Sequence, residues 1–380
     1  MSTSHDPIVI VSAARTPMGS FQGDFASLSA HDLGGAAIKA AVERAAAGSK
    51  FSAELVTEVL FGNCLMAGQG QAPARQAGFK GGLPKSAGAV TLSKMCGSGM
   101  RAAMFAHDML LAGSHDVLVA GGMESMTNAP YVLPKMRGGA RLGHTAVVDH
   151  MFLDGLEDAY DKGRLMGTFA EDCAETFQFT RQVQDDYALA SLSRALEAQN
   201  SGAFADEVTA VAVTSRKGTV IIDADEQPKT ARPDKIPQLK PAFREGGTVT
   251  AANSSSISDG AAALVLASEE AAKAQGLTIR AHIVGHASHA QAPGLFTTAP
   301  VPAAQKLLER IGWSKQDVDL WEVNEAFAVQ VLSFLEHFGI ADDDPRVNPV
   351  GGAIAVGHPL ASSGVRLILN LARGFEAHPE

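Results

Sequence analysis

The sequence is poor in cysteine, and this shortage excludes several classes of protein. Its 380 residues include three cysteines, Cys64, Cys96 and Cys173. They are too few and too widely spaced for a disulfide framework, and they lack the spacing of metal ligands. Such sparse use of cysteine is typical of a reducing compartment, so we expect a cytoplasmic protein.

The chain also lacks long apolar runs and clusters of Lys or Arg. No run is long enough to cross a bilayer, and residues 1–7 do not begin a signal peptide, so no association with a membrane is expected. The net charge of −10 argues against a nucleic-acid surface. What the chain does have is length and 46% hydrophobic residues, enough for a large core in two or three domain-sized units.

Segments typical of strands and of helices alternate in the first third of the chain. The expected strands are short apolar or β-branched runs at residues 8–11, 59–63, 89–92 and 116–120. Alanine-rich segments between them are typical of helices, the first capped by Asp32. This alternation predicts an α/β fold with a largely parallel sheet.

The texture changes at residue 123, where glycines, prolines and charges become frequent. Two helices are expected here, at residues 170–177 behind a capping box of Thr168 and Glu171, and at residues 180–200. We interpret residues 123–256 as an inserted loop domain. Residues 1–122, completed by 257–278, then form an N-terminal half, and residues 279–380 form a C-terminal half.

The C-terminal half repeats features of the N-terminal half in the same order. A strand that ends in Gly62-Asn63 is matched by residues 318–324, which end in Asn324, and Ser98-Gly99-Met100-Arg101 is matched by Ser363-Gly364-Val365-Arg366. We therefore expect two similar α/β halves. The repeat also predicts a closing strand after the last helix, and because the sequence ends at Glu380, the last strands of the C-terminal half are expected to be missing, as in a truncated chain.

A glycine-rich turn places Cys96 between an expected strand and an apolar helix. Gly97 and Gly99 would let the backbone turn tightly and approach a ligand. The free N–H groups and the positive end of the helix dipole would favour a thiolate over a thiol. A lone cysteine is more often a core residue, so the hypothesis of a nucleophile depends on its partners.

Two further segments offer such partners. Glycine-rich residues 351–357 deliver His358 ahead of a proline, and Asn324 lies where an expected strand meets a helix. A histidine within hydrogen-bond reach would take the thiol proton for attack on an acyl carbonyl. A side-chain amide could hold a water that stabilises the resulting oxyanion. Each residue alone would more often be structural.

Together these motifs resemble those of the thiolase family, the acyl-CoA:acetyl-CoA C-acyltransferases. The resemblance extends from Pro7 to about Phe375, and it is carried by residues 94–100, 248–259, 324–328 and 351–359. It implies the thiolase-like fold, two similar α/β halves in α-β-α-β-α layers with an inserted loop domain. It also implies reversible CoA-dependent Claisen condensation or thiolytic cleavage of a 3-ketoacyl-CoA, through an acyl thioester on Cys96.

The resemblance also implies roles for single residues. Cys96 would carry the acyl group, His358 would serve as its base, and Asn324 would position a water in the oxyanion hole. The CoA thioester would contact Ser255, Ala326, Phe327, Met166 and Gly352, with Lys229 as a candidate for its phosphates. No metal or cofactor is implied, since CoA thioesters are substrates. The expected partners are acyl-CoA or acetyl-CoA and further copies of the chain in a homodimer or homotetramer, with residues 121–143 in the region of tetramer contacts.

The sequence departs from the family pattern at two places. The loop after His358 carries Ala361 where the family has glycine. The family also closes with a Cys-x-Gly strand whose cysteine exchanges a proton with the acetyl-CoA carbon, and no cysteine follows Cys173. One alternative is therefore a non-catalytic or partly active acyl-CoA-binding protein. A ketoacyl synthase is a second alternative, disfavoured by one motif histidine instead of two.

Overall fold

A seven-stranded sheet forms the centre of the N-terminal half. The computed structural model describes residues 6–377, so a closing strand beyond Glu380 lies outside the described residues. The strands are in the order β11-β1-β10-β5-β3-β4, with β2 paired to β10. Their bounds are β1 Ile8–Arg15, β2 Gly19–Ser20, β3 Glu58–Gly62, β4 Gly88–Leu92, β5 Val117–Ser125, β10 Ser258–Ser268 and β11 Ala281–His282.

The sheet is mixed rather than largely parallel. Strand β3 runs parallel to β4 and β5, as the alternation of segments predicts, but β10 is antiparallel to both β1 and β5. Because β10 enters the sheet from beyond residue 257, its direction could not be read from the local sequence. The four expected strands are confirmed, and β5 continues through its glycines to Ser125. Gly122 is a glycine that the packing requires, because a side chain there would collide with the backbone of Ala361.

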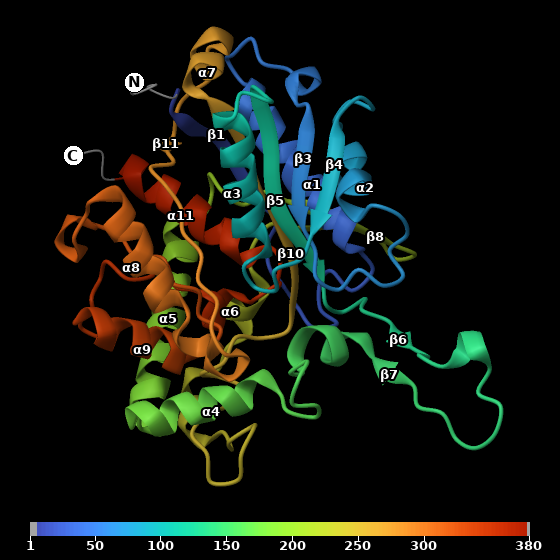
Figure 1. Ribbon diagram of the computed structural model, residues 1–380, viewed down its shortest axis with the longest axis vertical. Coiled ribbons are helices and arrows are strands. Elements are labelled where there is room, and N and C mark those ends of the chain that lie inside the picture. The colour runs from blue at the N-terminus through green and yellow to red at the C-terminus, as the bar shows by residue number, and fades with distance from the viewer. Residues whose placement is uncertain (1–5, 378–380) are drawn as a thin grey trace.

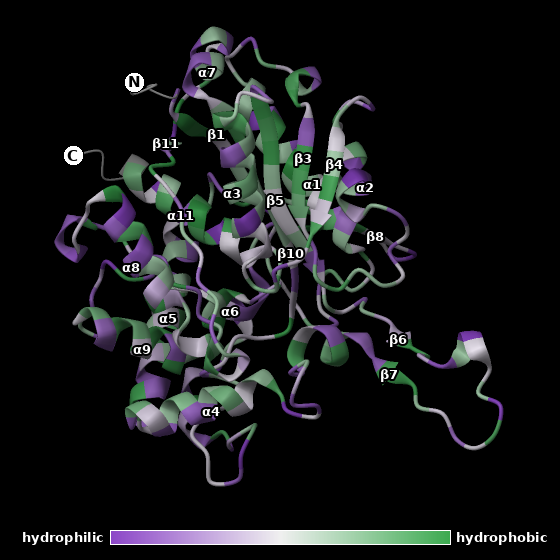
Figure 2. Cartoon of the chain, in the orientation of Figure 1, coloured by the Kyte–Doolittle hydropathy of each residue, from purple (hydrophilic) through white to green (hydrophobic). Residues whose placement is uncertain are grey.

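Helices cover both faces of this sheet (Figure 1). Helices α1 (Ala30–Ala46) and α2 (Pro73–Lys80) pack on one face, and α3 (Ser98–Leu111) and α11 (Ser363–Ala377) pack on the other. Figure 2 shows the apolar strands between them. Ser29 is the N-cap of α1, and Asp32, the third residue of the helix, completes a capping box with it. The expectation that Asp32 is the cap is therefore wrong by three residues.

The C-terminal half contains the helices α8 (Pro300–Ile311), α9 (Ala328–Phe338), α10 (Ala353–Val356) and α11. The strand expected at residues 318–324 is not formed within the described part of the chain, where a single bridge joins Trp321 to Val347. The Trp321 ring instead packs against Phe334 and Phe338 of α9 at centroid distances of 5.5 and 5.4 Å.

The inserted segment carries its own helices and two hairpins. They are α4 (Met166–Phe177), α5 (Arg181–Ser201) and α6 (Glu226–Thr230), with β6 (Tyr131–Val132) paired to β7 (Val148–Asp149) and β8 (Val211–Ser215) to β9 (Gly218–Ile222). Helix α7 (Glu269–Gln275) follows β10. Short turns of helix lie at Ala53–Leu55, Met136–Gly138, Phe152–Leu156, Pro233–Gln238, Pro293–Thr298 and Lys315–Asp317. None of the helices that the structure describes is long and apolar enough to span a membrane.

Both helices expected in the insertion are confirmed, but the capping box is not. Helix α4 begins at Met166, so Thr168 and Glu171 lie inside it. Glu171 instead accepts hydrogen bonds from the backbone N–H groups of Thr248 and Val249, at 3.0 and 2.8 Å. This carboxylate therefore attaches the segment before Ser255 to helix α4.

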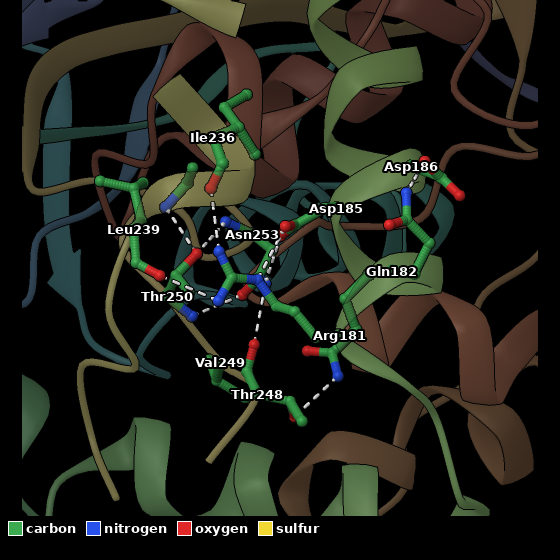
Figure 3. A network of polar contacts seen from close by, with 12 residues as sticks. Arg181, Gln182, Asp185, Asp186, Ile236, Leu239, Thr248, Val249, Thr250 and Asn253 are labelled. Carbon is green, nitrogen blue, oxygen red and sulfur yellow. Dashed lines mark hydrogen bonds and ion pairs between the residues drawn. The ribbon is translucent and has the colours of Figure 1, made fainter. Parts of the chain in front are cut away.

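A polar network at the start of α5 holds the same segment from the other side (Figure 3). Arg181 forms an ion pair with Asp185 at 2.7 Å and donates to the carbonyl oxygens of Ile236 and Leu239, both at 2.9 Å. Asp185 in turn accepts from Nδ2 of Asn253 at 3.0 Å. Because Asp185 and Asn253 are buried, these bonds are shielded from water and fix residues 248–255 on α5.

Candidate active site

The structure brings Cys96 and His358 into direct contact. The Nε2 atom of His358 lies 3.0 Å from the Cys96 sulfur, although 262 residues separate the two in the chain. Cys96 precedes Gly97, the N-cap of α3, and His358 lies in the loop before α11. Since α3 and α11 pack side by side on one face of the sheet, their N-terminal ends place the thiol and the imidazole together.

The turn that carries Cys96 is strained at Met95, not at its glycines. Met95 has a φ of +49°, which favours glycine, whereas Gly97 has an ordinary φ of −88°. The expectation that Gly97 makes the turn is therefore wrong. Gly99 serves the close approach of backbone, because a Cβ there would lie 2.5 Å from the carbonyl oxygen of Ala361.

Ser98 holds the strained turn in place. Its hydroxyl donates to the carbonyl oxygen of Met95 at 2.6 Å and accepts from the N–H of Lys94 at 2.7 Å. The side chain is fully buried, so water does not compete for these bonds. The sequence pointed to Ser98 only as part of a motif, because its partners are backbone groups within the turn.

His358 is oriented by Ser363, the second residue of the site that sequence reasoning missed. The hydroxyl of Ser363 lies 2.6 Å from Nδ1 of His358 and 3.2 Å from the carbonyl oxygen of Pro359. A carbonyl can only accept, so in the tautomer that carries its proton on Nδ1 the Ser363 oxygen accepts that proton while the hydroxyl hydrogen points to Pro359. This arrangement leaves Nε2 unprotonated and facing the thiol.

Burial keeps both members of the pair neutral. It raises the pKa of the Cys96 thiol to about 11, with Glu124 adding to the rise. It also lowers the pKa of His358 to about 4, and the nearby charge of Arg366 adds to that shift. The expectation that the helix terminus makes Cys96 a thiolate is therefore wrong for the resting site, because desolvation outweighs the dipole.

A buried carboxylate, Glu124, holds the segment that follows β3. It accepts hydrogen bonds from the backbone N–H groups of Cys64 and Leu65, at 3.0 and 2.9 Å, and from Nδ2 of Asn63 at 2.7 Å. Burial raises the pKa of Glu124. The carboxylate joins the end of β3 to β5, and a charged residue inside an otherwise apolar strand was the signal in the sequence that could have marked it.

Asn324 is attached to the His358 loop through its neighbour Glu325. Glu325 accepts from the Tyr187 hydroxyl at 2.9 Å and from the N–H of Ile354 at 3.1 Å. A side chain at Gly352 would collide with the Glu325 carboxylate, so Gly352 has a packing role here. Within the described residues, Oδ1 of Asn324 is buried without a hydrogen-bond partner. An acceptor left open in this way suits a bound water or ligand.

The residues expected to contact a CoA thioester form one wall. The N–H of Ser255 donates to the carbonyl oxygen of Ala326 at 2.9 Å, and Met166 packs against a cluster that contains Ala326 and Phe327. Three residues after Ser255, the hydroxyl of Ser258 accepts from the N–H of His358 at 3.1 Å. The wall is thus continuous with the base. Lys229 is exposed in the last turn of α6, the helix whose Gln227 bonds to Ser256 and Ser258 beside this wall.

Models of protein families match this chain over nearly its whole length. The thiolase N-terminal domain matches residues 8–270, and the thiolase C-terminal domain matches residues 277–378. The chain is 49% identical over 368 residues to acetyl-CoA acetyltransferase 2 of Arabidopsis thaliana, covering 96% of this chain and 89% of that protein. It is 47% identical over 371 residues to acetyl-CoA acetyltransferase of Escherichia coli, covering 97% and 92%.

Solved structures agree with these matches. The Acat5 thiolase from Ascaris suum in complex with coenzyme A superimposes with a TM-score of 0.90 at 39% identity, over 97% of this chain and 93% of that one. The acetyl-CoA acetyltransferase of Bacillus anthracis gives a TM-score of 0.94 at 35% identity, over 100% and 94%. With both family domains matched in order, and with the thiol and imidazole meeting where two similar helices begin, the chain belongs to the thiolase family.

Proposed function

We propose that this chain is an acetyl-CoA C-acetyltransferase that works through an acyl thioester on Cys96. The observation that carries the proposal is the 3.0 Å contact between the Cys96 sulfur and Nε2 of His358. The names of the relatives, acetyl-CoA acetyltransferases, support the same reaction. A protein that only bound acyl-CoA would need no base beside a half-buried thiol, so the non-catalytic alternative is not favoured.

The first half-reaction follows from this geometry. Nε2 of His358 takes the thiol proton as the Cys96 sulfur attacks the thioester carbonyl, and the bond from carbon to the cysteine sulfur forms. The bond from that carbon to the CoA sulfur then breaks, and His358 returns the proton to the departing CoA thiolate. Ser363 holds Nδ1 throughout, so the ring keeps one orientation for both proton transfers.

The developing oxyanion needs hydrogen-bond donors. We assign one site to the backbone N–H of Cys96, and another to His358 together with a water that donates one hydrogen to the open Oδ1 of Asn324 and the other to the oxyanion. The wall of Ser255, Ala326, Phe327 and Met166 would hold the pantetheine arm, and Lys229 remains the candidate for the phosphates. The chain would need no cofactor besides its CoA thioester substrates.

We also propose that the chain assembles with copies of itself. Strand β4 is an edge strand, and Val90 on it and Phe105 on the adjoining α3 are 45% and 44% exposed. An open edge with apolar side chains suits pairing with a second chain, as in a homodimer. The arm of β6 and β7 protrudes from the molecule and carries Tyr131 and Leu142, 67% and 98% exposed, which suits further contacts in a homotetramer (Figure 1).

Mass spectrometry of the intact protein mixed with acetyl-CoA tests the first half-reaction. We expect one acetyl adduct per chain, absent in Cys96→Ala. Thiolysis of acetoacetyl-CoA, followed by the loss of its absorbance, tests the complete reaction. A folded protein that forms no adduct at Cys96 would refute the proposed mechanism, whereas an adduct without thiolysis would confine it to acyl transfer.

A further inference from the structure

Two histidines and an aspartate converge on the outer side of α3, away from the active site. His107 and Asp108 are consecutive residues of this helix, and His286 lies in the segment that follows β11. Oδ1 of Asp108 is 3.1 Å from Nδ1 of His107 and 2.8 Å from Nε2 of His286. The two imidazole rings meet edge to face, with centroids 5.1 Å apart. We propose that these three side chains form a binding site for a divalent transition-metal ion such as Zn²⁺.

The distances fit such an ion. One ligand atom from each side chain lies within 4.8 Å of the other two. A tetrahedral zinc ion with bonds of about 2.0–2.2 Å holds its ligands roughly 3.3–3.5 Å apart. The two distances to Asp108 lie close to that value, so small rotations of the side chains would place all three ligand atoms around one ion.

The ligand types select the class of metal. Two imidazole nitrogens and one carboxylate oxygen match the preferences of Zn²⁺, Co²⁺, Ni²⁺ and Cu²⁺. Ca²⁺ and Mg²⁺ favour sites made of oxygen atoms alone. The side chain of Asp108 is 54% exposed, so water can reach the ion and complete its coordination. The net charge of −10 also favours cations over anions at the surface.

The site would join parts of the molecule that belong to different halves of the chain. His107 and Asp108 lie on α3, and the carbonyl oxygen of His286 accepts from Arg310 of α8 at 2.7 Å. The segment between β11 and the helical turn at Pro293 has no regular structure and runs alongside α3 (Figure 1). A bound ion would therefore cross-link an irregular segment to a helix, and it should raise the thermal stability of the chain.

The site is separate from the catalytic pair. His107 is nine residues beyond Ser98, which corresponds to about 14 Å along the helix axis. The sequence gave no sign of it, since spacing patterns reveal ligands that are close in the chain, and 178 residues separate Asp108 from His286. Without a metal, the same geometry is a hydrogen-bonded cluster in which Asp108 accepts from both rings. The two arrangements differ in their response to zinc.

Zinc titration of three proteins distinguishes them: the unchanged chain, His286→Ala and the control His289→Ala. His289 lies on the same segment, but its ring contacts Gln291 and Lys306 instead. Each protein is first dialysed against a chelator and alkylated at Cys96, because the Cys96–His358 pair could itself bind zinc. We expect one Zn²⁺ per chain by calorimetry and a rise in melting temperature, both retained in His289→Ala. In His286→Ala we expect the affinity to fall by at least about tenfold.

Two further measurements keep the outcome unambiguous. Melting curves and circular dichroism without metal show whether His286→Ala is folded, and His107→Ala provides a second ligand removal on the other element. Co²⁺ in place of Zn²⁺ should give a visible spectrum without a band from thiolate ligation. The proposal is overturned if the unchanged chain binds no zinc. It is also overturned if His286→Ala and His107→Ala bind zinc with the affinity of the unchanged chain, which would leave a hydrogen-bonded cluster only.

Discussion

The two halves of the chain use the same position for different tasks. Ser98 begins α3 and Ser363 begins α11, and the two helices cross at the next residue of each, Gly99 and Gly364. In the N-terminal half, the serine holds the backbone of the Cys96 turn through the carbonyl oxygen of Met95. In the C-terminal half, the equivalent serine holds the ring of His358. One half thus fixes the turn that carries Cys96, and the other holds the His358 ring that faces it.

The residues that the repeat aligns ahead of these helices also have different roles in the two halves. The repeat aligns Phe61 with Glu322 and Asn63 with Asn324. Phe61 is a fully buried core residue, and Asn63 donates to Glu124. Glu322 by contrast is an ionisable group whose pKa is raised by burial to about 8, and Asn324 leaves its Oδ1 open. The N-terminal half uses these positions for packing and for a structural hydrogen bond, whereas the C-terminal half places a titratable group and an unpaired amide oxygen at them.

Removing the base should produce the largest effect. We expect His358→Ala to lower the rate of acetylation of Cys96 by about 10²–10⁴-fold, since the neutral thiol then has no group to take its proton. Rapid quenching followed by mass spectrometry measures that rate in a single turnover. A loss smaller than tenfold would mean that another group deprotonates Cys96. The ring is buried, so a melting curve has to show that the variant remains folded at the temperature of the assay.

The crossing of α3 and α11 should be the most sensitive point of the fold. A Cβ on Gly99 would lie 2.5 Å from the carbonyl oxygen of Ala361, and one on Gly364 would lie 2.9 Å from the backbone nitrogen of Met100. We expect each Ala substitution to lower the free energy of unfolding by about 1–3 kcal/mol, because backbone cannot move aside easily. Urea unfolding measures the change.

Gly78→Ala in α2 is the matched control for these helix glycines. The nearest atom to a Cβ there is 3.6 Å away, an ordinary contact. Alanine should therefore raise the free energy of unfolding, by up to about 1 kcal/mol, through its higher helix propensity. Equal losses in the free energy of unfolding at Gly99, Gly364 and Gly78 would show that the crossing of α3 and α11 is no more sensitive than another helix.

The two serines should separate orientation from stability. Ser363→Ala should slow the acetylation of Cys96 by about tenfold or more, because the His358 ring loses the partner of Nδ1 and its fixed tautomer. Ser98→Ala should lower the free energy of unfolding by about 1 kcal/mol, because the N–H of Lys94 loses its partner, while the carbonyl oxygen of Met95 still accepts from the N–H of residue 98. Measuring both quantities for both variants, with Ser363→Thr as a conservative rescue, tests the contrast. If the two variants changed the rate of acetylation and the free energy of unfolding by the same amounts, the contrast between the serines would be refuted.

Much of this arrangement could be predicted from the sequence. Strand and helix periodicity located the elements around Cys96, and the glycine turns marked both Cys96 and His358 as exceptional. The order of similar motifs predicted that α3 and α11 are equivalent, and their reciprocal contact at Gly99 and Gly364 agrees with that prediction. Patterns of this kind succeed because they report local geometry and burial.

The features that were missed depend on tertiary contacts or on side-chain hydrogen bonds that the sequence pattern does not show. The strand β10 takes its place between β1 and β5 only once the insertion has returned the chain to the sheet. The positive φ of Met95 is sustained by the Ser98 hydroxyl, which no propensity reveals. The neutral state of the Cys96–His358 pair results from desolvation, which outweighs the helix dipole that the sequence suggested. The expected domain boundaries at residues 122, 256 and 278 and the cytoplasmic location stay predictions.

Glu322 offers the finest test of the difference between the halves. Burial, only partly offset by the charge of Arg366, raises its pKa from 4.5 to about 8 in the folded chain. Between these two values the folded state holds a proton that the unfolded state has released, so the free energy of unfolding should fall as the pH rises. One proton gives a slope of at most about 1.4 kcal/mol per pH unit.

Glu322→Gln should flatten this dependence, since the amide is neutral at every pH and keeps nearly the same volume. Urea unfolding at pH 5 and pH 8 measures it, with Glu336→Gln, at an exposed position of α9, as the control that should change nothing. Parallel pH curves for Glu322→Gln and the unchanged chain would show that Glu322 is ionised in both states. In that case the ionised carboxylate would have to face Arg366, whose Nε and one terminal nitrogen are buried without a hydrogen-bond partner in the described residues. The C-terminal position would then hold an ion pair where the N-terminal half holds Phe61.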